Sequence, residues 1–240
     1  MRDPAARPPL SLYLREWLWT WARFRIRPDA RAAAGRDGGG QPVLVIPGFL
    51  AGDRFTTALR ATLDLAGYHA FPWEGGINRG PHDGLFEQLS DRLDAIEGES
   101  PGPVTIVGWS LGGVFAREIA KRRPERVARV VTLGTPFSGD PRNNRLRALY
   151  EVVTRQSVDQ PPDGITAHEK PPVPTLALWS WSDGIVPPAN ARGEPGETDR
   201  AIEVDCRHIG FVWQHPALVA ILDALEMDVA QPALGPPERV

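Results

Sequence analysis

The stretch VTIVGWSLGGVFAREIAKR, residues 104–122, decides the fold that this sequence predicts. Its first four residues are apolar or β-branched, as in a buried strand. From residue 114 onward, apolar residues recur at helical spacing. Only the short run GWSLG, residues 108–112, separates the two patterns. The stretch therefore predicts a strand, a sharp turn and a helix in immediate succession.

Such a turn would place Ser110 at its apex. The end of the strand and the start of the helix approach closely, so the residues two before and two after the serine must be small, and Gly108 and Gly112 meet this requirement. The positive end of the following helix would lie behind the hydroxyl. The pattern G-x-S-x-G also occurs by chance in flexible turns, but a strand before it and a helix after it favour a nucleophilic serine.

Strand and helix patterns alternate on both sides of this unit. Apolar or β-favouring runs predict strands at residues 43–46, 69–73, 126–133, 173–180 and 201–205. Helical patterns occur at residues 54–66, 84–96 and 216–225. This alternation is typical of an α/β domain with a mostly parallel central sheet flanked by helices. The length of 240 residues suits one such domain.

The alternation breaks at residues 137–172, where arginine, asparagine and proline surround a short helical pattern at residues 146–154. An insertion of this length between strands is usually functional or mobile. We therefore predict a small lid-like insertion. The alternative is a surface excursion with no part in binding.

The α/β domain is expected to span residues 41–228, with a C-terminal tail at 229–240. Before it, residues 10–27 carry apolar and aromatic side chains at steps of three or four, with arginines between them, which predicts an amphipathic helix. Such a helix can pack on its own domain, mediate self-association or lie on a membrane surface, but it is too short and too charged to span a bilayer. The Ala- and Gly-rich residues 29–40 predict a flexible linker, so residues 1–40 form an N-terminal extension.

Composition excludes several classes of protein. The formal net charge of -3 provides no basic field for a nucleic acid. The single cysteine cannot form an internal disulfide, and the N-terminus lacks the apolar core and cleavage site of a signal peptide. A cytoplasmic location is the simplest expectation.

A serine hydroxyl is a poor nucleophile at neutral pH, so the predicted turn requires a histidine base nearby. His208 follows the last predicted strand and would lie at the same sheet edge as the serine, whereas His215 begins a predicted helix and is the weaker alternative. The base in turn requires a carboxylate to orient it. Asp183 directly follows the preceding strand, while Asp205 and Glu203 belong to the last one. The order Ser110, Asp183, His208 is the order typical of a nucleophile-elbow enzyme.

Attack on a carbonyl creates an oxyanion that two backbone N–H groups would stabilise. Leu111, directly after the serine, supplies one of them. We expect Phe49 to supply the other, because Gly48 allows the loop after residues 43–46 to approach closely. Leu50 is the alternative donor, and a simple Pro47-Gly48 turn is the alternative interpretation.

Five motifs together resemble the α/β-hydrolase superfamily over residues 41–225. They are VIPGF at 45–49, GWSLGG at 108–113, LGTPF at 133–137, SDGIVP at 182–187 and HIG at 208–210. Within the superfamily, LGTP and the loop GINRGP at 76–81 are similar to bacterial lipase-like and esterase-like proteins. The resemblance implies ester hydrolysis through an acyl-enzyme, with Ser110, Asp183 and His208 as the triad and no metal or organic cofactor. The sequence departs from many members in carrying Pro47 where they carry histidine.

Apolar residues near the predicted site indicate an apolar substrate. Four of them flank the loops at the carboxyl edge of the sheet and are candidate substrate-binding residues: Leu50, Trp109, Phe137 and Trp181. Because the sequence does not establish an interfacial lid, we expect an esterase that acts on small-molecule apolar esters of small to medium size rather than a true lipase. An acyltransferase or thioesterase with the same triad, and a non-catalytic binding protein of the same fold, are the alternatives.

Overall fold

The computed structural model describes residues 3–19, 27–154 and 165–228. Their strands form one parallel sheet in the order β2-β1-β3-β4-β5-β6. The strands are β1 (Pro42–Ile46), β2 (His69–Pro72), β3 (Val104–Trp109), β4 (Val127–Leu133), β5 (Thr175–Trp179) and β6 (Arg200–Glu203). Their bounds differ from the predicted ones by no more than two residues, and the predicted mostly parallel sheet is confirmed.

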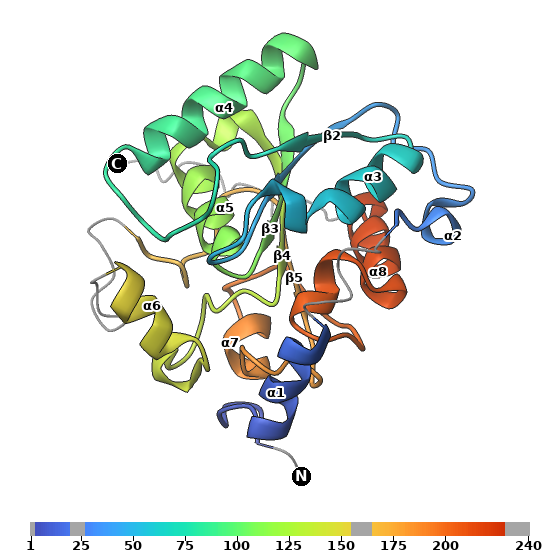
Figure 1. The fold of residues 1–240 in the computed structure, drawn as a ribbon. Helices are drawn as coiled ribbons and strands as arrows, with labels where there is room; N and C mark the ends of the chain where they lie inside the picture. The colour runs from blue at the N-terminus through green and yellow to red at the C-terminus, as the bar shows by residue number, and fades with distance from the viewer. Residues whose placement is uncertain (1–2, 20–26, 155–164, 229–240) are drawn as a thin grey trace.

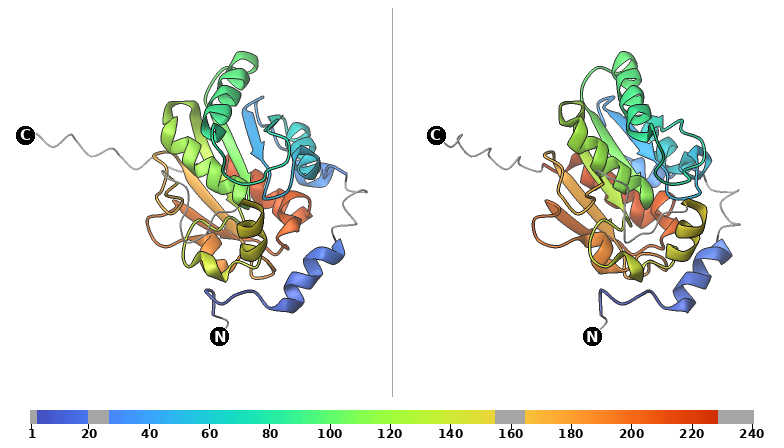
Figure 2. Two further views of the ribbon diagram at one scale, coloured as in Figure 1. Left: turned by 60° about the vertical axis from the view of Figure 1, so that its left-hand side comes forward. Right: turned by 90° about the vertical axis from the view of Figure 1, so that its left-hand side faces the viewer.

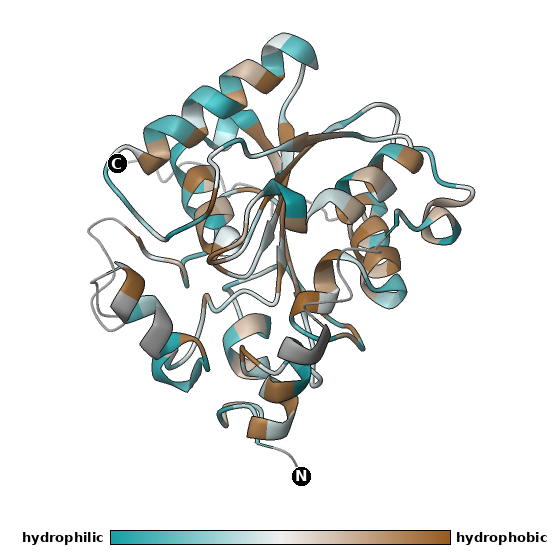
Figure 3. Ribbon diagram, in the orientation of Figure 1, coloured by the Kyte–Doolittle hydropathy of each residue, from teal (hydrophilic) through white to brown (hydrophobic). Residues whose placement is uncertain are grey.

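Helices cover both faces of the sheet (Figure 1). One face carries α3 (Thr57–Leu65) and α8 (His215–Glu226), and the other carries α4 (Leu85–Glu99) and α5 (Leu111–Arg122). In Figure 3, α4 alternates between hydrophilic and hydrophobic segments, as expected for a helix with one buried face. All residues of β1, β3 and β5 are buried. This burial on two sides explains why these strands read as continuous apolar runs rather than as alternating patterns.

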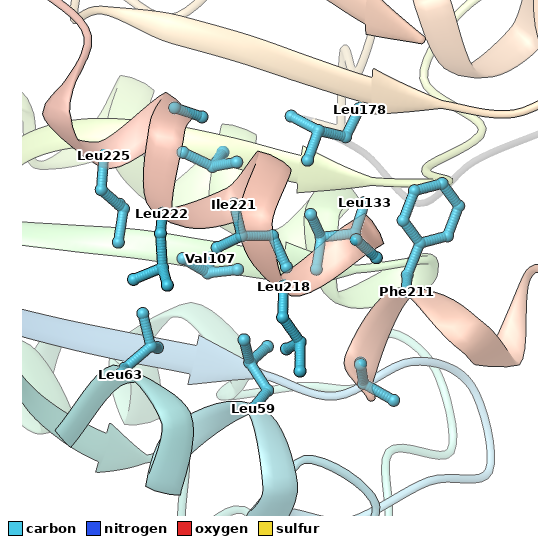
Figure 4. Close-up of a cluster of buried hydrophobic side chains, with 14 of the residues drawn as sticks. Leu59, Leu63, Val107, Leu133, Leu178, Phe211, Leu218, Ile221, Leu222 and Leu225 are labelled. Carbon is cyan, nitrogen blue, oxygen red and sulfur yellow. The ribbon is translucent and has the colours of Figure 1, made fainter. Parts of the chain in front are cut away.

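The core beneath α8 ties the sheet to two helices. Figure 4 shows the labelled side chains of α8 between those of α3 and those of the central strands. The contributing residues include Leu59, Leu63, Val107, Leu133, Leu178, Leu218, Ile221 and Leu222. Burying each leucine or isoleucine contributes about 1.5–3 kcal/mol, so this cluster holds the strand ends in a fixed relation to one another.

Three short helices gather at the carboxyl end of the sheet (Figures 1 and 2). They are α1 (Leu10–Trp19), α6 (Arg147–Thr154) and α7 (Pro188–Arg192). Helix α6 belongs to the predicted insertion, and α1 is the described part of the predicted N-terminal helix. Residues 20–26 of the predicted helix lie outside the described residues. Within residues 3–19, 27–154 and 165–228, no helix is both long and apolar enough to cross a membrane.

The expectation of a flexible linker at residues 29–40 is wrong. Residues Ala30–Ala33 form a short helix, α2, whose Ala32 and Ala33 are buried against α3 and α8. Asp29 caps this helix and lies 2.7 Å from Nδ1 of His215, while Arg36 forms ion pairs with two acidic residues of α8. Small alanine side chains let the segment pack closely, a possibility that composition alone does not distinguish from flexibility.

Candidate active site

Ser110 occupies a strained turn between β3 and α5. Its backbone has φ 54° and ψ -122°, a conformation that residues with a side chain rarely adopt. The surrounding structure holds it there, because the Ser110 amide donates to the Leu133 carbonyl at 2.8 Å and the Ser110 carbonyl accepts from the Gly113 amide at 3.0 Å. The side chain is only 7% exposed. The turn therefore fixes the position of the hydroxyl.

Glycines around the serine are required by close backbone approach. A Cβ on Gly108 would collide with the backbone of Gly113, and one on Gly112 would collide with the carbonyl of Ile46 at the end of β1. A Cβ on Gly113 would collide with the side chain of Thr135. The requirement for small residues at positions 108 and 112 is thus confirmed, and it extends to position 113.

Asp183 and His208 form a buried pair. Asp183 follows β5 and His208 follows β6, and Oδ2 of Asp183 lies 2.7 Å from Nδ1 of His208. The second carboxylate oxygen, Oδ1, accepts from the amides of Ile185 and Val186, each at 2.8 Å. These bonds fix the carboxylate. A proton on Nδ1 of His208 would donate to Asp183, leaving Nε2 able to accept a proton.

Neighbouring strand ends bring the serine and this pair to one place. The Ser110 amide bonds to the last residue of β4, and the next residue, Gly134, lies against the pair. A Cβ on Gly134 would lie 2.9 Å from Oδ2 of Asp183 and 3.1 Å from Nδ1 of His208. The three predicted triad residues therefore follow β3, β5 and β6 at one edge of the sheet.

The alternative residues lie elsewhere or have other partners. His215 begins α8 and pairs with Asp29. Asp205 accepts from the hydroxyl of Ser182 at 3.2 Å, and Glu203 is an exposed residue of β6. These contacts favour His208 and Asp183 over the alternatives.

The carboxylates around His208 favour its charged form. Burial would lower the pKa of His208, but the charge and hydrogen bond of Asp183, together with the charge of Glu16, outweigh burial and raise it above its ordinary value. Glu16 lies on α1, and its carboxylate accepts from the amide of His208 at 2.9 Å. Sequence analysis did not identify Glu16, although it is the single acidic residue in the basic stretch at 10–27.

Phe49 and Leu111, the two expected oxyanion donors, line the same cavity as Ser110. Leu111 is the first residue of α5, so its N–H has no acceptor within the helix. Phe49 lines the same cavity as Ser110 and Leu111, and Gly48 approaches the serine so closely that an added Cβ would lie 3.0 Å from that of Ser110. The amide of Leu50 donates to the carbonyl of Asn78 at 2.7 Å. This bond occupies the alternative donor and favours Phe49.

A cavity of about 280 Å³ opens beside Ser110. Its walls come from the Phe49 loop, α5, the segment after β4, and the insertion, including Phe49, Leu111, Val114, Pro136, Phe137, Leu146, Tyr150, Ile165 and Ala167. The lining is thus mainly apolar. Residues of the insertion form one wall, as a lid would.

Only part of the predicted substrate-binding set lines this cavity. Phe137 is in the wall. Trp109 instead belongs to the core, where its indole N–H donates to the carbonyl of His208 at 3.0 Å. Leu50 is 39% exposed, and Trp181 packs edge-on against Trp179 at 5.7 Å between ring centroids. These three residues do not line the cavity in the described part of the chain.

A fully buried arginine holds the wall formed by the insertion. Arg117 of α5 donates to the carbonyls of Ala167, His168, Glu169 and Glu197, and its guanidinium stacks on the ring of Phe137 at 4.1 Å. Burial lowers its pKa to about 10. Sequence analysis did not identify this residue, because an arginine on an amphipathic helix ordinarily faces solvent.

Comparison with known proteins supports the fold that the sequence motifs indicate. The family model described as alpha/beta hydrolase fold matches residues 96–158. Lipase B of Aspergillus fumigatus superimposes with a TM-score of 0.61 at 19% identity, covering 85% of this chain and 58% of that one. The protein has the α/β-hydrolase fold. This finding confirms the fold that the sequence motifs implied.

Among curated proteins, the pimeloyl-[acyl-carrier protein] methyl ester esterase of Shewanella woodyi is 34% identical over 98 residues, which are 41% of this chain and 37% of the esterase. Lipase LipV of Mycobacterium tuberculosis is 23% identical over 175 residues, or 73% of this chain and 60% of the lipase. The chain therefore spans less than two thirds of the length of either relative.

Proposed function

We propose that this α/β-hydrolase is a serine carboxylic-ester hydrolase, with Ser110 as nucleophile, His208 as base and Asp183 as the residue that orients the base. The observation that carries the proposal is the 2.7 Å contact between buried Asp183 and His208, at the sheet edge where the strained turn presents Ser110 to an apolar cavity. The names of the two curated relatives, an ester esterase and a lipase, point to the same class of reaction.

The acylation step uses each of these groups. His208 accepts the proton of the Ser110 hydroxyl as that oxygen attacks the ester carbonyl carbon. The carbonyl oxygen becomes negative and accepts hydrogen bonds from the N–H groups of Phe49 and Leu111. When the tetrahedral intermediate collapses, the C–O bond to the alcohol breaks and His208 returns the proton to the departing alcohol. The acyl group remains on Ser110.

Deacylation reverses the roles with water as the nucleophile. His208 removes a proton from water as the water oxygen attacks the acyl-serine carbonyl. The bond to Ser110 then breaks, the serine oxygen recovers the proton, and the carboxylic acid leaves. Asp183 stabilises the positively charged imidazole in both halves of the reaction.

The cavity suggests which esters fit. Its volume of about 280 Å³ lies near the lower end of the range of small-molecule pockets, and its walls are mainly apolar. We infer that short and medium acyl chains are hydrolysed faster than long ones. The rate of hydrolysis would fall with chain length once the acyl group no longer fits against Phe137 and Tyr150.

The proposal is tested by hydrolysis of p-nitrophenyl esters of increasing acyl length. We expect Ser110→Ala to abolish activity. Ser90→Ala, a matched change in α4, should retain it, because the Ser90 hydroxyl bonds to the Phe86 carbonyl of its own helix. A fluorophosphonate should label Ser110 in the wild type alone. Near-full activity in Ser110→Ala would disprove the assignment, and transfer of the acyl group to an added alcohol in place of water would favour an acyltransferase.

The cellular setting stays a prediction. A cytoplasmic location and a membrane-surface or self-associating role for residues 10–27 both rest on the sequence. Leu10 and Leu14 of α1 are 56% and 54% exposed, which suits either kind of contact. Sedimentation with anionic lipid vesicles and analytical ultracentrifugation of the protein, with and without Leu10→Ser and Leu14→Ser, would distinguish them.

A further inference from the structure

One buried carboxylate at the site has no part in the proposed triad. Glu16 of α1 is 1% exposed. Its Oε1 accepts from the amides of Gly184 at 3.1 Å and His208 at 2.9 Å, and its Oε2 accepts from the amide of Ile209 at 3.1 Å. A single side chain thereby bonds to the backbones of two loops, one directly after Asp183 and the other carrying His208.

The fold provides a seat for α1 at this position. Its backbone at Leu12 lies on Gly184, where an added Cβ would approach the Leu12 carbonyl to 2.6 Å. The chain before the helix is attached as well, because Arg145 donates to the Pro8 carbonyl at 2.6 Å and Ala189 donates to the Pro4 carbonyl at 2.9 Å. Figures 1 and 2 show α1 at the same end of the molecule as α6 and α7. These contacts hold α1 in place and so position Glu16 beside Asp183 and His208.

Burying an ionised carboxylate beside Asp183 costs free energy. Burial and the nearby charge of Asp183 raise the pKa of Glu16, although the charge of His208 and the hydrogen bonds from the backbone amides oppose this rise. An apolar side chain would dock α1 without burying a charge beside Asp183. What the carboxylate adds is three oriented hydrogen bonds and a negative charge close to His208.

We propose that Glu16 is a positioning residue of the active site, which holds the Asp183 and His208 loops in register and stabilises the positively charged form of His208. This role rests on the proposed function, since it assigns Glu16 to the support of the same base. It makes α1 an integral part of the active site rather than an appended helix. The alternative is that Glu16 only anchors α1.

Two carboxylates contribute to the electrostatic environment of His208, those of Asp183 and Glu16. A separate hollow near its loop is lined by Leu12, Ser182 and Gln214 together with four ionisable residues, Arg15, Asp205, Cys206 and Arg207. Removing the charge of Glu16 should therefore act on His208 directly. An imidazole with one fewer negative neighbour loses its proton at lower pH.

The test compares Glu16→Gln with Arg15→Gln in the full chain. Glutamine keeps the shape of Glu16, but it removes the charge and turns one of its two acceptor groups into a donor. We expect kcat to fall by roughly 10- to 100-fold in Glu16→Gln, because small displacements of a base have effects of that size, with KM little changed. The acid limb of the kcat/KM profile should also move to lower pH. Arg15→Gln, an exposed change on the same helix, should leave both unchanged.

An NMR titration of the His208 ring separates this proposal from the proposed function. The titration is made in the Ser110→Ala background, with and without Glu16→Gln, and circular dichroism verifies that each variant is folded. A lower pKa of His208 in Glu16→Gln supports the role of Glu16. An unchanged pKa and an unchanged pH profile would overturn it. Failure of the wild type to hydrolyse any ester would instead count against the proposed function, while the titration would still decide the coupling.

Discussion

The side-chain amide of Asn78 donates a hydrogen bond to the carbonyl of Pro47 at 2.8 Å. Asn78 is buried, its Oδ1 accepts from the Gly80 amide at 3.1 Å, and its backbone exchanges hydrogen bonds with Leu50 and Ala51. The loop at 76–81 therefore clamps the loop that carries Phe49. These contacts show that Asn78 supports the loop that carries Phe49, the proposed oxyanion donor.

We expect Asn78→Ala to lower kcat roughly tenfold, because the Phe49 amide would lose its fixed position and one such donor is worth a few kcal/mol at most. KM should change little, since Asn78 does not line the cavity. Steady-state kinetics with a short p-nitrophenyl ester would measure both. Arg79→Ala, the exposed neighbour, is the control, and equal kinetics in the two variants would rule out the clamp.

The pH dependence of activity follows from the raised pKa of His208. The reaction needs the neutral imidazole, so activity should be lost as the pH falls through this pKa. Because the pKa lies above the ordinary value for histidine, the acid limb of kcat/KM should occur at a higher pH than an unperturbed histidine would give. A profile of kcat/KM between pH 4 and 9 would measure it, and an acid limb typical of a carboxylic acid would contradict the assignment of His208.

Asp183→Asn should reduce kcat by about 10⁴-fold, the effect of the same change in the serine protease triad. The neutral amide cannot stabilise the charged imidazole, and it would favour the wrong tautomer of His208. The acid limb should shift to lower pH for the same reason. Asp205→Asn is the matched control, because Asp205 bonds to Ser182 and not to His208. A larger loss in Asp205→Asn than in Asp183→Asn would exchange their roles.

The sequence predicted the sheet and the three triad candidates because each depends on a local pattern. Continuous apolar runs such as residues 43–46 identify strands buried on two faces, and chemically distinctive residues at the ends of such strands meet at one edge. Ser110, Asp183 and His208 all follow strands in this way. The positions of these three residues could be predicted from the direction and parallel arrangement of the strands alone.

Contacts between segments far apart in the sequence were not predictable in this way. Glu16 meets His208 across 192 positions in the chain, and no periodicity at residues 10–27 indicates that contact. Trp109 was expected to bind substrate because it flanks a loop at the carboxyl edge of the sheet, yet alternation along β3 turns its side chain into the core. Arg117 satisfies carbonyls more than 45 positions away. Only tertiary structure reveals such partners.

Arg117→Ala should lower the free energy of unfolding by about 3 kcal/mol or more. The change removes the donor to four part-buried carbonyls, and a hydrogen bond to a charged group contributes about 1.5–3 kcal/mol. Lysine should not restore stability, because a single ammonium cannot reproduce the planar guanidinium fork. Urea unfolding followed by tryptophan fluorescence would measure the change, with a change at the partly exposed, ion-paired Arg123, Arg123→Ala, as a control. A loss below about 1 kcal/mol would mean that the wall at 165–169 does not depend on Arg117.

Gly134→Ala should reduce activity more than it reduces stability. Gly134 has φ 53°, and a Cβ there would lie 2.8 Å from the Phe211 ring and 2.9 Å from Oδ2 of Asp183. Relief of this contact must displace Phe211, Asp183 or His208, and a shift of about 1 Å in a catalytic group can lower the rate about 100-fold. The control is Gly98→Ala in α4, where an added Cβ meets nothing within 4 Å and alanine should stabilise the helix by about 0.5–1 kcal/mol. Measurements of kcat and thermal unfolding on both variants test this relation, and full activity in folded Gly134→Ala would show that the Asp183–His208 pair tolerates displacement.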